Sequence, residues 1–376
     1  MPKRLPSAPP VLPGLTYMRP LGSGGFADVF LYAQDMPRRQ VAVKVLPTGI
    51  HDAELVRMFN AEADILAHLS AHPSIVTVYQ AGISADGRPY IVMEYCPGSL
   101  AQRYRRERLP LDEVLTIGVK MAGAVETAHR AGLIHRDIKP SNILITTFGS
   151  PVLADFGISA SLAPRTGEEV LAMSVPWSAP EVIGEQTSGT VASEVWGLGA
   201  TVYSLLAGHS PFERAEAGQN ARDQLRRRIL RASFPQMRRP DVPEQVLDVL
   251  AVAMARDPRD RYPSALAFAQ ALRDVQHTLG FPPTPLEVAV EEWVPGDETV
   301  DFGDAATRGP QISSVPHASR RRATAPTPLT ARDEDTDISS PQRVAARHVW
   351  PWLVVGAVAC AAAVLVVWAV VSGGMT

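Results

Sequence analysis

The sequence predicts an α+β fold in which a small β-rich lobe precedes a larger helical lobe. Up to about residue 96, short runs of β-branched and aromatic residues alternate with turn residues such as Asp86-Gly87. Cys96-Pro97-Gly98 breaks this pattern, and from Leu111 onward the apolar residues recur at helical spacing. The chain has 376 residues, which is long enough for two such lobes, and we assign them to residues 14–276.

The first lobe should contain a glycine-rich turn between two strands. We expect strands over 29–32, 40–45, 75–79 and 90–95, with a helix over 52–69. The glycines of Gly22-Ser23-Gly24-Gly25 come just before the first of these strands. A dinucleotide-binding fold would instead place a helix after the glycines and a third glycine where Ala27 stands. Taken alone, the cluster fits a tight hairpin as well as a loop that covers phosphates.

The second lobe should be built mainly from helices. The apolar pattern predicts an amphipathic helix over 114–131, a buried helix over 191–207 and further helices to about residue 276. Between them, residues 159–174 are polar and show no consistent periodicity, so we expect a mobile segment there.

The two ends of the chain differ from the lobes in composition. Residues 1–13 are proline-rich and suggest a flexible leader, and residues 277–348 suggest a disordered juxtamembrane linker. Residues 349–371 carry no charge and would span about 34 Å as a helix, enough for a bilayer core of about 30 Å. Arg343 and Arg347 precede this stretch, so the positive-inside rule places the N-terminal side in the cytoplasm. We therefore expect a single-pass cell-membrane protein with cytoplasmic lobes and a short extracytoplasmic tail, 372–376.

Charge and cysteine content exclude several classes of site. The formal net charge is −3, so bulk charge gives no reason to expect a nucleic-acid partner. The only cysteines, Cys96 and Cys360, exclude a disulfide framework and a cysteine-based zinc site. The chain uses four lysines against 32 arginines, which suggests that Lys44 and Lys139 occupy places needing a compact ammonium group.

The strongest chemical signal lies in residues 135–142, His-Arg-Asp-Ile-Lys-Pro-Ser-Asn. Asp137 and Asn142 are five residues apart, so one short loop can direct both at one substrate. A third polar ligand, Asp155, follows eighteen residues after Asp137. Two carboxylates and an amide converging in this way suit Mg²⁺ and a phosphate ester.

Over residues 15–276 the motifs resemble those of eukaryotic-like protein kinases, and most closely the bacterial membrane-anchored Hanks-type serine/threonine kinases. The matching residues, in family order, are Gly22-x-Gly24-Gly25-Phe26, Val41-Ala42-Val43-Lys44, Glu62, His135-Arg136-Asp137, Asn142, Asp155-Phe156-Gly157 and Ala179-Pro180-Glu181. The resemblance implies the bilobal protein-kinase fold, with ATP and Mg²⁺ (or Mn²⁺) bound between the lobes.

The resemblance also implies a role for each matching residue. Asp137 would accept the proton of the substrate hydroxyl and Lys139 would steady the γ-phosphate, while Asn142 and Asp155 would bind the metal. The ATP-binding residues would be Leu21, Gly22, Gly24, Gly25, Val29, Ala42, Lys44, Glu62, Met93, Glu94 and Cys96. Glu62 would hold Lys44 against the α- and β-phosphates, unless it is simply a solvated helix residue. Cys96 would be a hinge residue, and we favour a filling role over a redox switch.

Three further positions follow from the same resemblance. Glu181 and Arg261 would form a structural ion pair. Ser174 would be the hydroxyl that distinguishes serine or threonine substrates from tyrosine. Glu194 stands where the family usually has an aspartate that anchors the catalytic loop, and its extra methylene places the catalytic rate in question.

Regulation and partners are expected from single residues. Arg136 would form a basic pocket for a phosphorylated activation segment, in which Thr166 is the first candidate and Ser159 and Ser161 follow. Thr299 and Thr336 lie in acidic linker sequence, and would be either docking sites for phosphothreonine-reading domains or ordinary solvated linker.

The sequence as a whole predicts a serine/threonine protein kinase with autophosphorylation and a kinase–kinase dimer as a further partner. A pseudokinase scaffold is the alternative, although it would be expected to lack one of Lys44, Asp137, Asn142 or Asp155. A small-molecule kinase is disfavoured by the Ala179-Pro180-Glu181 element.

Overall fold

The structure, a computed structural model, describes residues 5–23, 27–46, 53–156, 175–216, 218–237 and 239–289, without the side chains at 53–58, 61 and 62. All of these belong to the first of two units, residues 1–298. Most of the expected linker, the helix expected over 349–371 and the tail expected over 372–376 lie outside the described residues. Within the described ranges no helix is both long and apolar enough to cross a membrane.

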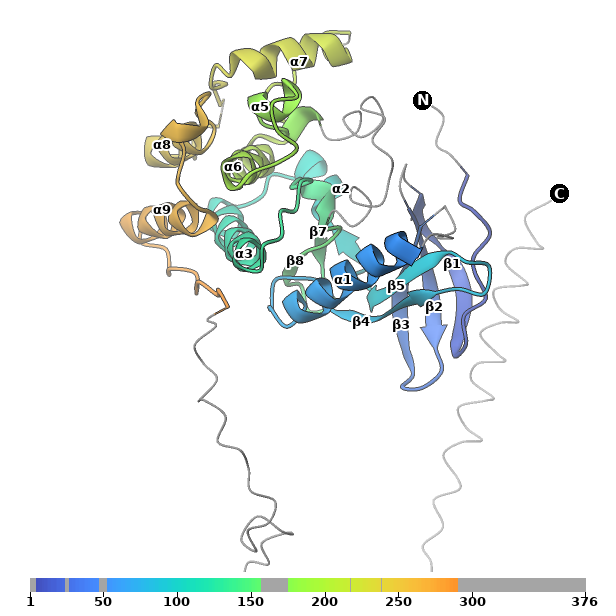
Figure 1. Cartoon of the computed structure of the whole chain (residues 1–376). Coiled ribbons are helices and arrows are strands. Elements are labelled where there is room, and N and C mark those ends of the chain that lie inside the picture. The colour runs from blue at the N-terminus through green and yellow to red at the C-terminus, as the bar shows by residue number, and fades with distance from the viewer. Residues whose placement is uncertain are drawn as a thin grey trace, which may run out of the picture. The chain divides into compact units, whose positions relative to one another are not determined.

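The first lobe is an antiparallel five-stranded sheet with strand order β1-β2-β3-β5-β4 (Figure 1). Its elements are β1 (Leu15–Ser23), β2 (Asp28–Gln34), β3 (Arg39–Val45), α1 (Ala53–Leu69), β4 (Val78–Ile83) and β5 (Pro89–Glu94). The strands expected over 29–32, 40–45 and 90–95 and the helix expected over 52–69 are confirmed. The strand expected over 75–79 is displaced toward the C-terminus, because Ile75 instead forms a parallel bridge with Leu153.

Alternation along β3 divides the sheet into two faces. Val41, Val43 and Val45 are fully buried on one face, where they pack with Phe30 and Tyr32 of β2. Ala42 and Lys44 therefore point to the opposite face. There Ala42 packs with Val152 and Ala154, which belong to the other lobe. This strand thus delivers its lysine to the junction between the lobes.

Residues 5–13 differ from the expected flexible leader. Leu12 is 3% exposed and belongs to the apolar cluster on the outer face of the sheet. The Tyr32 hydroxyl donates a hydrogen bond to the carbonyl of Pro10 at 2.7 Å, and Ser7 bonds to Asp28. The physical reason is that this sheet face is apolar, and the segment covers part of it.

The second lobe is helical. Its helices are α2 (Leu100–Arg106), α3 (Leu111–Arg130), α5 (Pro180–Ile183), α6 (Val191–Ala207), α7 (Arg222–Arg231), α8 (Glu244–Ala253) and α9 (Ala265–Thr278), with single 3₁₀ turns at Pro140–Asn142, Val175–Trp177 and Pro258–Asp260. The helices expected over 114–131 and 191–207 are confirmed.

Helices α3, α6 and α9 pack closely at the centre of this lobe. A Cβ atom at Gly118 of α3 would lie 2.8 Å from a methyl group of Leu272 in α9 and 3.0 Å from one of Val202 in α6, so a larger residue would force these side chains to shift. Helix α6 begins with a capping box between Thr190 and Ser193 and ends at Gly208, whose φ is +79°. The bounds of the buried helix thus follow from its own cap residues.

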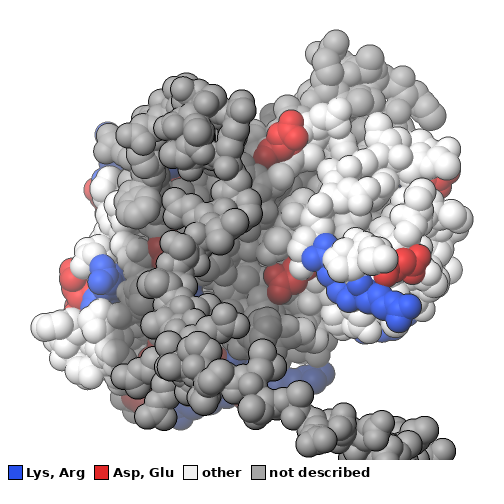
Figure 2. All heavy atoms as spheres, turned by 90° about the horizontal axis from the view of Figure 1, so that it is seen from below, with Lys and Arg blue, Asp and Glu red and all other residues white. Residues whose placement is uncertain are grey.

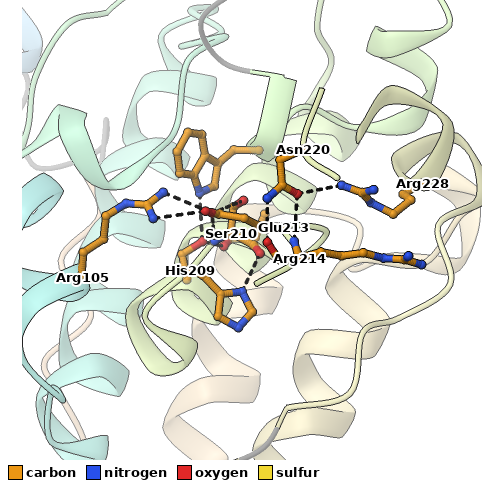
Figure 3. Close-up of polar contacts among 10 residues, drawn as sticks. Arg105, His209, Ser210, Glu213, Arg214, Asn220 and Arg228 are labelled. Carbon is orange, nitrogen blue, oxygen red and sulfur yellow. Dashed lines mark hydrogen bonds and ion pairs between the residues drawn. The ribbon is translucent and has the colours of Figure 1, made fainter. Parts of the chain in front are cut away.

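The segment between α6 and α7 is held by polar contacts rather than by regular structure (Figure 3). Both terminal nitrogens of Arg105 in α2 donate to the Glu213 carboxylate at 3.3 and 3.2 Å. Glu213 also accepts from the backbone N–H and hydroxyl of Ser210, each at 3.1 Å. Arg228 of α7 donates to the Phe212 carbonyl at 2.8 Å. These contacts fix α7 relative to α2.

A second small sheet lies at the junction of the lobes. It consists of β6 (Gly98–Ser99), β7 (Ile143–Ile145) and β8 (Pro151–Leu153), in that order. The β7–β8 hairpin separates the two sequence motifs that carry Asp137 and Asp155, and so brings them back together.

The helical lobe continues beyond the expected domain end at residue 276. After α9 the chain returns along α3, where Ala289 N–H donates to the Thr127 hydroxyl at 3.3 Å. The Glu287 carbonyl lies 2.9 Å from Nε2 of His72, at the end of α1. A Cβ at Gly123 would lie 2.5 Å from that same carbonyl, which is why the chain can approach α3 there. Residues 279–289 therefore belong to the folded lobe and not to the linker.

Candidate active site

The predicted catalytic loop connects α3 to β7 and is built on a buried histidine. His135 is fully buried, and its Nε2 lies 3.0 Å from the carbonyl of Ala154. The Asp137 backbone N–H donates to Nδ1 of the same ring at 3.2 Å. The ring also packs on Phe156, with centroids 4.5 Å apart. His135 thus ties the loop to the segment that carries Asp155.

The structure brings the three polar residues of this loop together. Lys139 Nζ lies 2.7 Å from Oδ2 of Asp137. The Asn142 amide nitrogen donates to the Asp137 backbone carbonyl at 2.8 Å and to its Oδ2 at 3.0 Å. These two bonds orient the Asn142 side chain, and its amide oxygen accepts from the Ser141 hydroxyl at 3.3 Å. The loop therefore presents a carboxylate beside an ammonium and an amide oxygen.

Lys44 meets Asp155 across the two lobes. Lys44 Nζ donates to Oδ1 of Asp155 at 3.0 Å, and the lysine side chain is only 12% exposed. The Lys44 ammonium lowers the pKa of the Asp155 carboxyl below its usual value. Asp155 adopts a φ of +62°, a left-handed conformation that costs a non-glycine residue about 1–3 kcal/mol. The strained backbone conformation therefore lies at Asp155, the residue that the sequence predicts to bind metal.

Several predicted residues belong to one apolar cluster at the lobe junction. Ala42 and Met93 are buried there with Leu21, Val29 and Cys96 packed beside them. Burial and the nearby Glu94 charge raise the pKa of the Cys96 thiol to about 12, so it stays protonated at neutral pH. This finding agrees with a filling role for Cys96 rather than a reactive thiolate.

Four residues of this cluster were not anticipated from the sequence. They are Val76, Leu144, Val152 and Ala154. Leu144 follows Asn142 by two residues in β7, and Val152 pairs with it in β8. The apolar runs that form the hairpin could be recognised in the sequence, but their pattern did not show which strand face would contact this cluster.

Glu194 braces the catalytic loop from α6. Its Oε1 accepts the backbone N–H of Arg136 at 2.5 Å, and its Oε2 lies 2.8 Å from Nε2 of His129. Glu194 is 3% exposed, and Arg136 adopts a left-handed φ of +66°. The longer side chain thus reaches the loop and contacts α3 as well.

The expected pair between Glu181 and Arg261 is present and buried. Arg261 donates to both carboxylate oxygens, at 2.7 and 2.8 Å, and its guanidinium lies 5.1 Å from the ring of Trp196. Beside this pair, a hollow lined by Arg136, Asp137 and Trp177 opens next to the catalytic loop.

Some predicted residues lie outside the described part of the chain. They are Gly24, Gly25, Ser159, Ser161, Thr166, Ser174, Thr299 and Thr336, together with the side chain of Glu62, whose backbone lies in α1. Gly22 is described and lies near the end of β1.

The residues present fit a divalent metal bound together with phosphates. Among the described residues, no three histidine, cysteine, aspartate or glutamate side chains gather into a metal-binding group. Asn142 and Asp155 instead supply two oxygen ligands on adjoining segments, since Ala154 N–H donates to the Asn142 carbonyl at 2.9 Å. Mg²⁺ commonly takes one or two protein ligands and completes its coordination with phosphate and water.

Comparison with known proteins agrees with this geometry. The model of the protein kinase domain family matches residues 15–274. The chain is 39% identical over 334 residues to serine/threonine-protein kinase PknK of Mycobacterium tuberculosis, covering 86% of this chain and 30% of that protein. It is 36% identical over 256 residues to serine/threonine-protein kinase PrkC of Bacillus subtilis, covering 66% of this chain and 38% of that protein.

A solved structure is also similar to this chain over the kinase domain. The crystal structure of the Mycobacterium tuberculosis PknI kinase domain aligns with a TM-score of 0.53 at 30% identity, covering 70% of this chain and 97% of that one. The chain therefore spans less than half the length of PknK and PrkC, but nearly all of a solved kinase domain.

Proposed function

Because the chain belongs to the protein kinase domain family, we propose that it is a serine/threonine protein kinase that transfers the ATP γ-phosphate to protein hydroxyl groups. The observation that carries this proposal is the meeting of two sets of residues at the lobe junction. Lys44 contacts Asp155, and Asp137 contacts Lys139 and Asn142 on the adjoining loop. A pseudokinase scaffold has no need of this complete set.

Each side chain has a place in the transfer. The Asp137 carboxylate accepts the proton as the substrate hydroxyl attacks, and Lys139 balances the negative charge beside it. Lys44 orients the α- and β-phosphates from β3. Asn142 and Asp155 would hold Mg²⁺, which neutralises phosphate charge when bound.

Serine or threonine is the acceptor that this chain favours. Lys139 stands two residues after the base, as in the serine/threonine kinases, and PknK, PrkC and PknF are all named as such. Ser174 is proposed to complete the hydroxyl selection.

Regulation, partners and location form a further part of the proposal. Autophosphorylation at Thr166 would place a phosphate near Arg136, and phosphorylated Thr299 or Thr336 would recruit phosphothreonine-reading domains. Residues 349–371 would tether a cytoplasmic kinase to the cell membrane, and a kinase–kinase dimer would support transfer between copies. On the described part of the face in Figure 2, basic and acidic side chains form small groups separated by uncharged surface, which suits protein substrates better than a polyanion.

The experiment is phosphate transfer by the full chain in detergent, with labelled ATP, Mg²⁺ and a generic protein substrate. Asp137→Asn keeps the shape of the loop but removes the proton acceptor, and should abolish incorporation. Asp112→Asn is the matched control, since Asp112 is a carboxylate in the first turn of α3, away from the catalytic loop. Incorporation that is equal in wild type and Asp137→Asn, or absent from both, would refute the proposal.

A further inference from the structure

Asp28 is a completely buried carboxylate at the start of β2. Its Oδ2 accepts hydrogen bonds from the backbone N–H and the hydroxyl of Ser7, at 2.9 and 2.6 Å. Its Oδ1 accepts from the hydroxyl of Ser23 at 2.7 Å, and Ser23 is the last residue of β1. One side chain thus joins the N-terminal segment to both strands that flank the glycine-rich turn.

Ser7 is also held from its other side. Arg88, in the turn between β4 and β5, donates to the Ser7 hydroxyl oxygen at 3.0 Å and to the Ala8 carbonyl at 2.9 Å. Its Nε donates to Oδ2 of Asp86 at 2.8 Å. Hydrogen bonds from Arg88 lower the pKa of the Asp86 carboxyl to about 2, so Asp86 is ionised at neutral pH. The segment therefore links the glycine-rich end of the sheet to the β4–β5 turn.

Because Asp28 is buried, its hydrogen bonds to Ser7 affect the stability of β1 and β2. A buried carboxylate is costly unless hydrogen-bond donors satisfy it. Both bonds described at Oδ2 come from Ser7, so releasing the segment would remove these donors from a buried carboxyl group that lies between β1 and β2. Asp28 and Ser23 face each other in the strand register, so the bond between them joins the two strand ends on either side of the glycine-rich stretch of the sequence.

We propose that residues 5–12 are a positioning element for the ATP-binding turn, and that Ser7 and Asp28 are the residues through which the segment acts. The inference rests on the kinase function proposed above. Affinity for ATP depends on the close approach of the turn's backbone to the phosphates, whereas proton transfer at Asp137 does not. Loosening the segment should therefore raise the KM for ATP while kcat changes little.

The test measures KM for ATP, kcat and melting temperature for the full chain. Ser7→Ala and Asp28→Ala should raise the KM for ATP about threefold to tenfold, which corresponds to about 0.7–1.4 kcal/mol, the net contribution of an ordinary hydrogen bond, with kcat within about twofold. Ser7→Thr retains the hydroxyl and should restore the wild-type KM. Hydrogen exchange at residues 21–23 and 28–30 should be faster in Ser7→Ala.

Tyr32→Phe is the matched control. It removes the 2.7 Å bond between the Tyr32 hydroxyl and the Pro10 carbonyl, so it weakens the same segment without touching Asp28. The inference would be overturned if Ser7→Ala and Tyr32→Phe lowered the melting temperature equally and left the KM for ATP unchanged. The segment would then only stabilise the sheet. If the wild type transfers no phosphate, the proposed function fails, and ATP dissociation constants from calorimetry still decide the inference.

Discussion

The contact between Glu194 and the catalytic loop gives the most informative perturbation. Glu194 accepts the Arg136 N–H at 2.5 Å while its other oxygen contacts His129. The Arg136 backbone is left-handed, with a φ of +66°, and needs a contact to hold it there. Glu194→Ala should release the loop that carries Asp137 without altering Asp137 itself.

The magnitude follows from the bonds that are lost. A hydrogen bond to a charged group contributes about 1.5–3 kcal/mol, and about 1.4 kcal/mol corresponds to a tenfold change in rate. Loss of the Arg136 bond alone should therefore lower kcat about 10-fold to 100-fold. Loss of both bonds should destabilise the fold by about 3–6 kcal/mol before any relaxation.

The assay compares kcat with the free energy of unfolding, because a merely structural residue would change only the latter. Glu126→Ala is the control, since Glu126 is also a buried carboxylate, accepting from Leu266 N–H at 3.1 Å and Arg130 Nε at 3.2 Å, but does not touch the catalytic loop. It should lose similar stability and keep its kcat. A Glu194→Ala enzyme whose kcat stays within about twofold of wild type would refute this reasoning.

Three other predictions concern single interactions. In the wild type the pKa of Asp155 is lowered by Lys44, so Mg²⁺-dependent nucleotide binding should persist as pH falls toward the usual aspartate value of about 3.9. In Lys44→Met, isothermal titration calorimetry should show this binding being lost at a higher pH. Identical pH profiles for the two proteins would contradict the contact between Lys44 and Asp155. Glu181→Gln leaves Arg261 buried without its charge partner, so the free energy of unfolding measured by urea denaturation should fall by about 3–5 kcal/mol. A loss below about 1 kcal/mol would mean that the ion pair contributes little to stability. Because the pKa of Cys96 is raised to about 12, iodoacetamide at neutral pH should modify its peptide far more slowly than free cysteine, and mass spectrometry showing rapid labelling would disprove the buried-thiol interpretation.

The sequence predicted those parts of the molecule in which local pattern and chemistry agree. The strand expected over 40–45, which carries Lys44, is present as β3, and the helical periodicity of 191–207 matched α6 residue for residue. The spacing of Asp137, Asn142 and Asp155 predicted their convergence, because a short hairpin returns the chain to the same place.

The remainder depends on contacts that no local pattern encodes. Proline-rich composition suggested a free leader, but an apolar sheet face formed by residues far along the sequence, such as Phe30 and Val41, holds Leu12 against it. Likewise, residues 279–289 were assigned to the linker because of their proline-rich composition, while their attachment depends on the space that Gly123 leaves on α3. The extra methylene of Glu194 raised a question about rate, and only the fold shows that it reaches His129 as well as the loop.

The central claim is that Asp137 directs the ATP γ-phosphate onto a serine or threonine hydroxyl. The most direct measurement is mass spectrometry of a protein substrate after incubation with the full chain, Mg²⁺ and ATP whose γ-phosphate oxygens carry a heavy isotope. We predict isotope-labelled phosphate on serine or threonine with the wild type, and none with Asp137→Asn. Label on tyrosine alone, or equal label with both enzymes, would contradict the account.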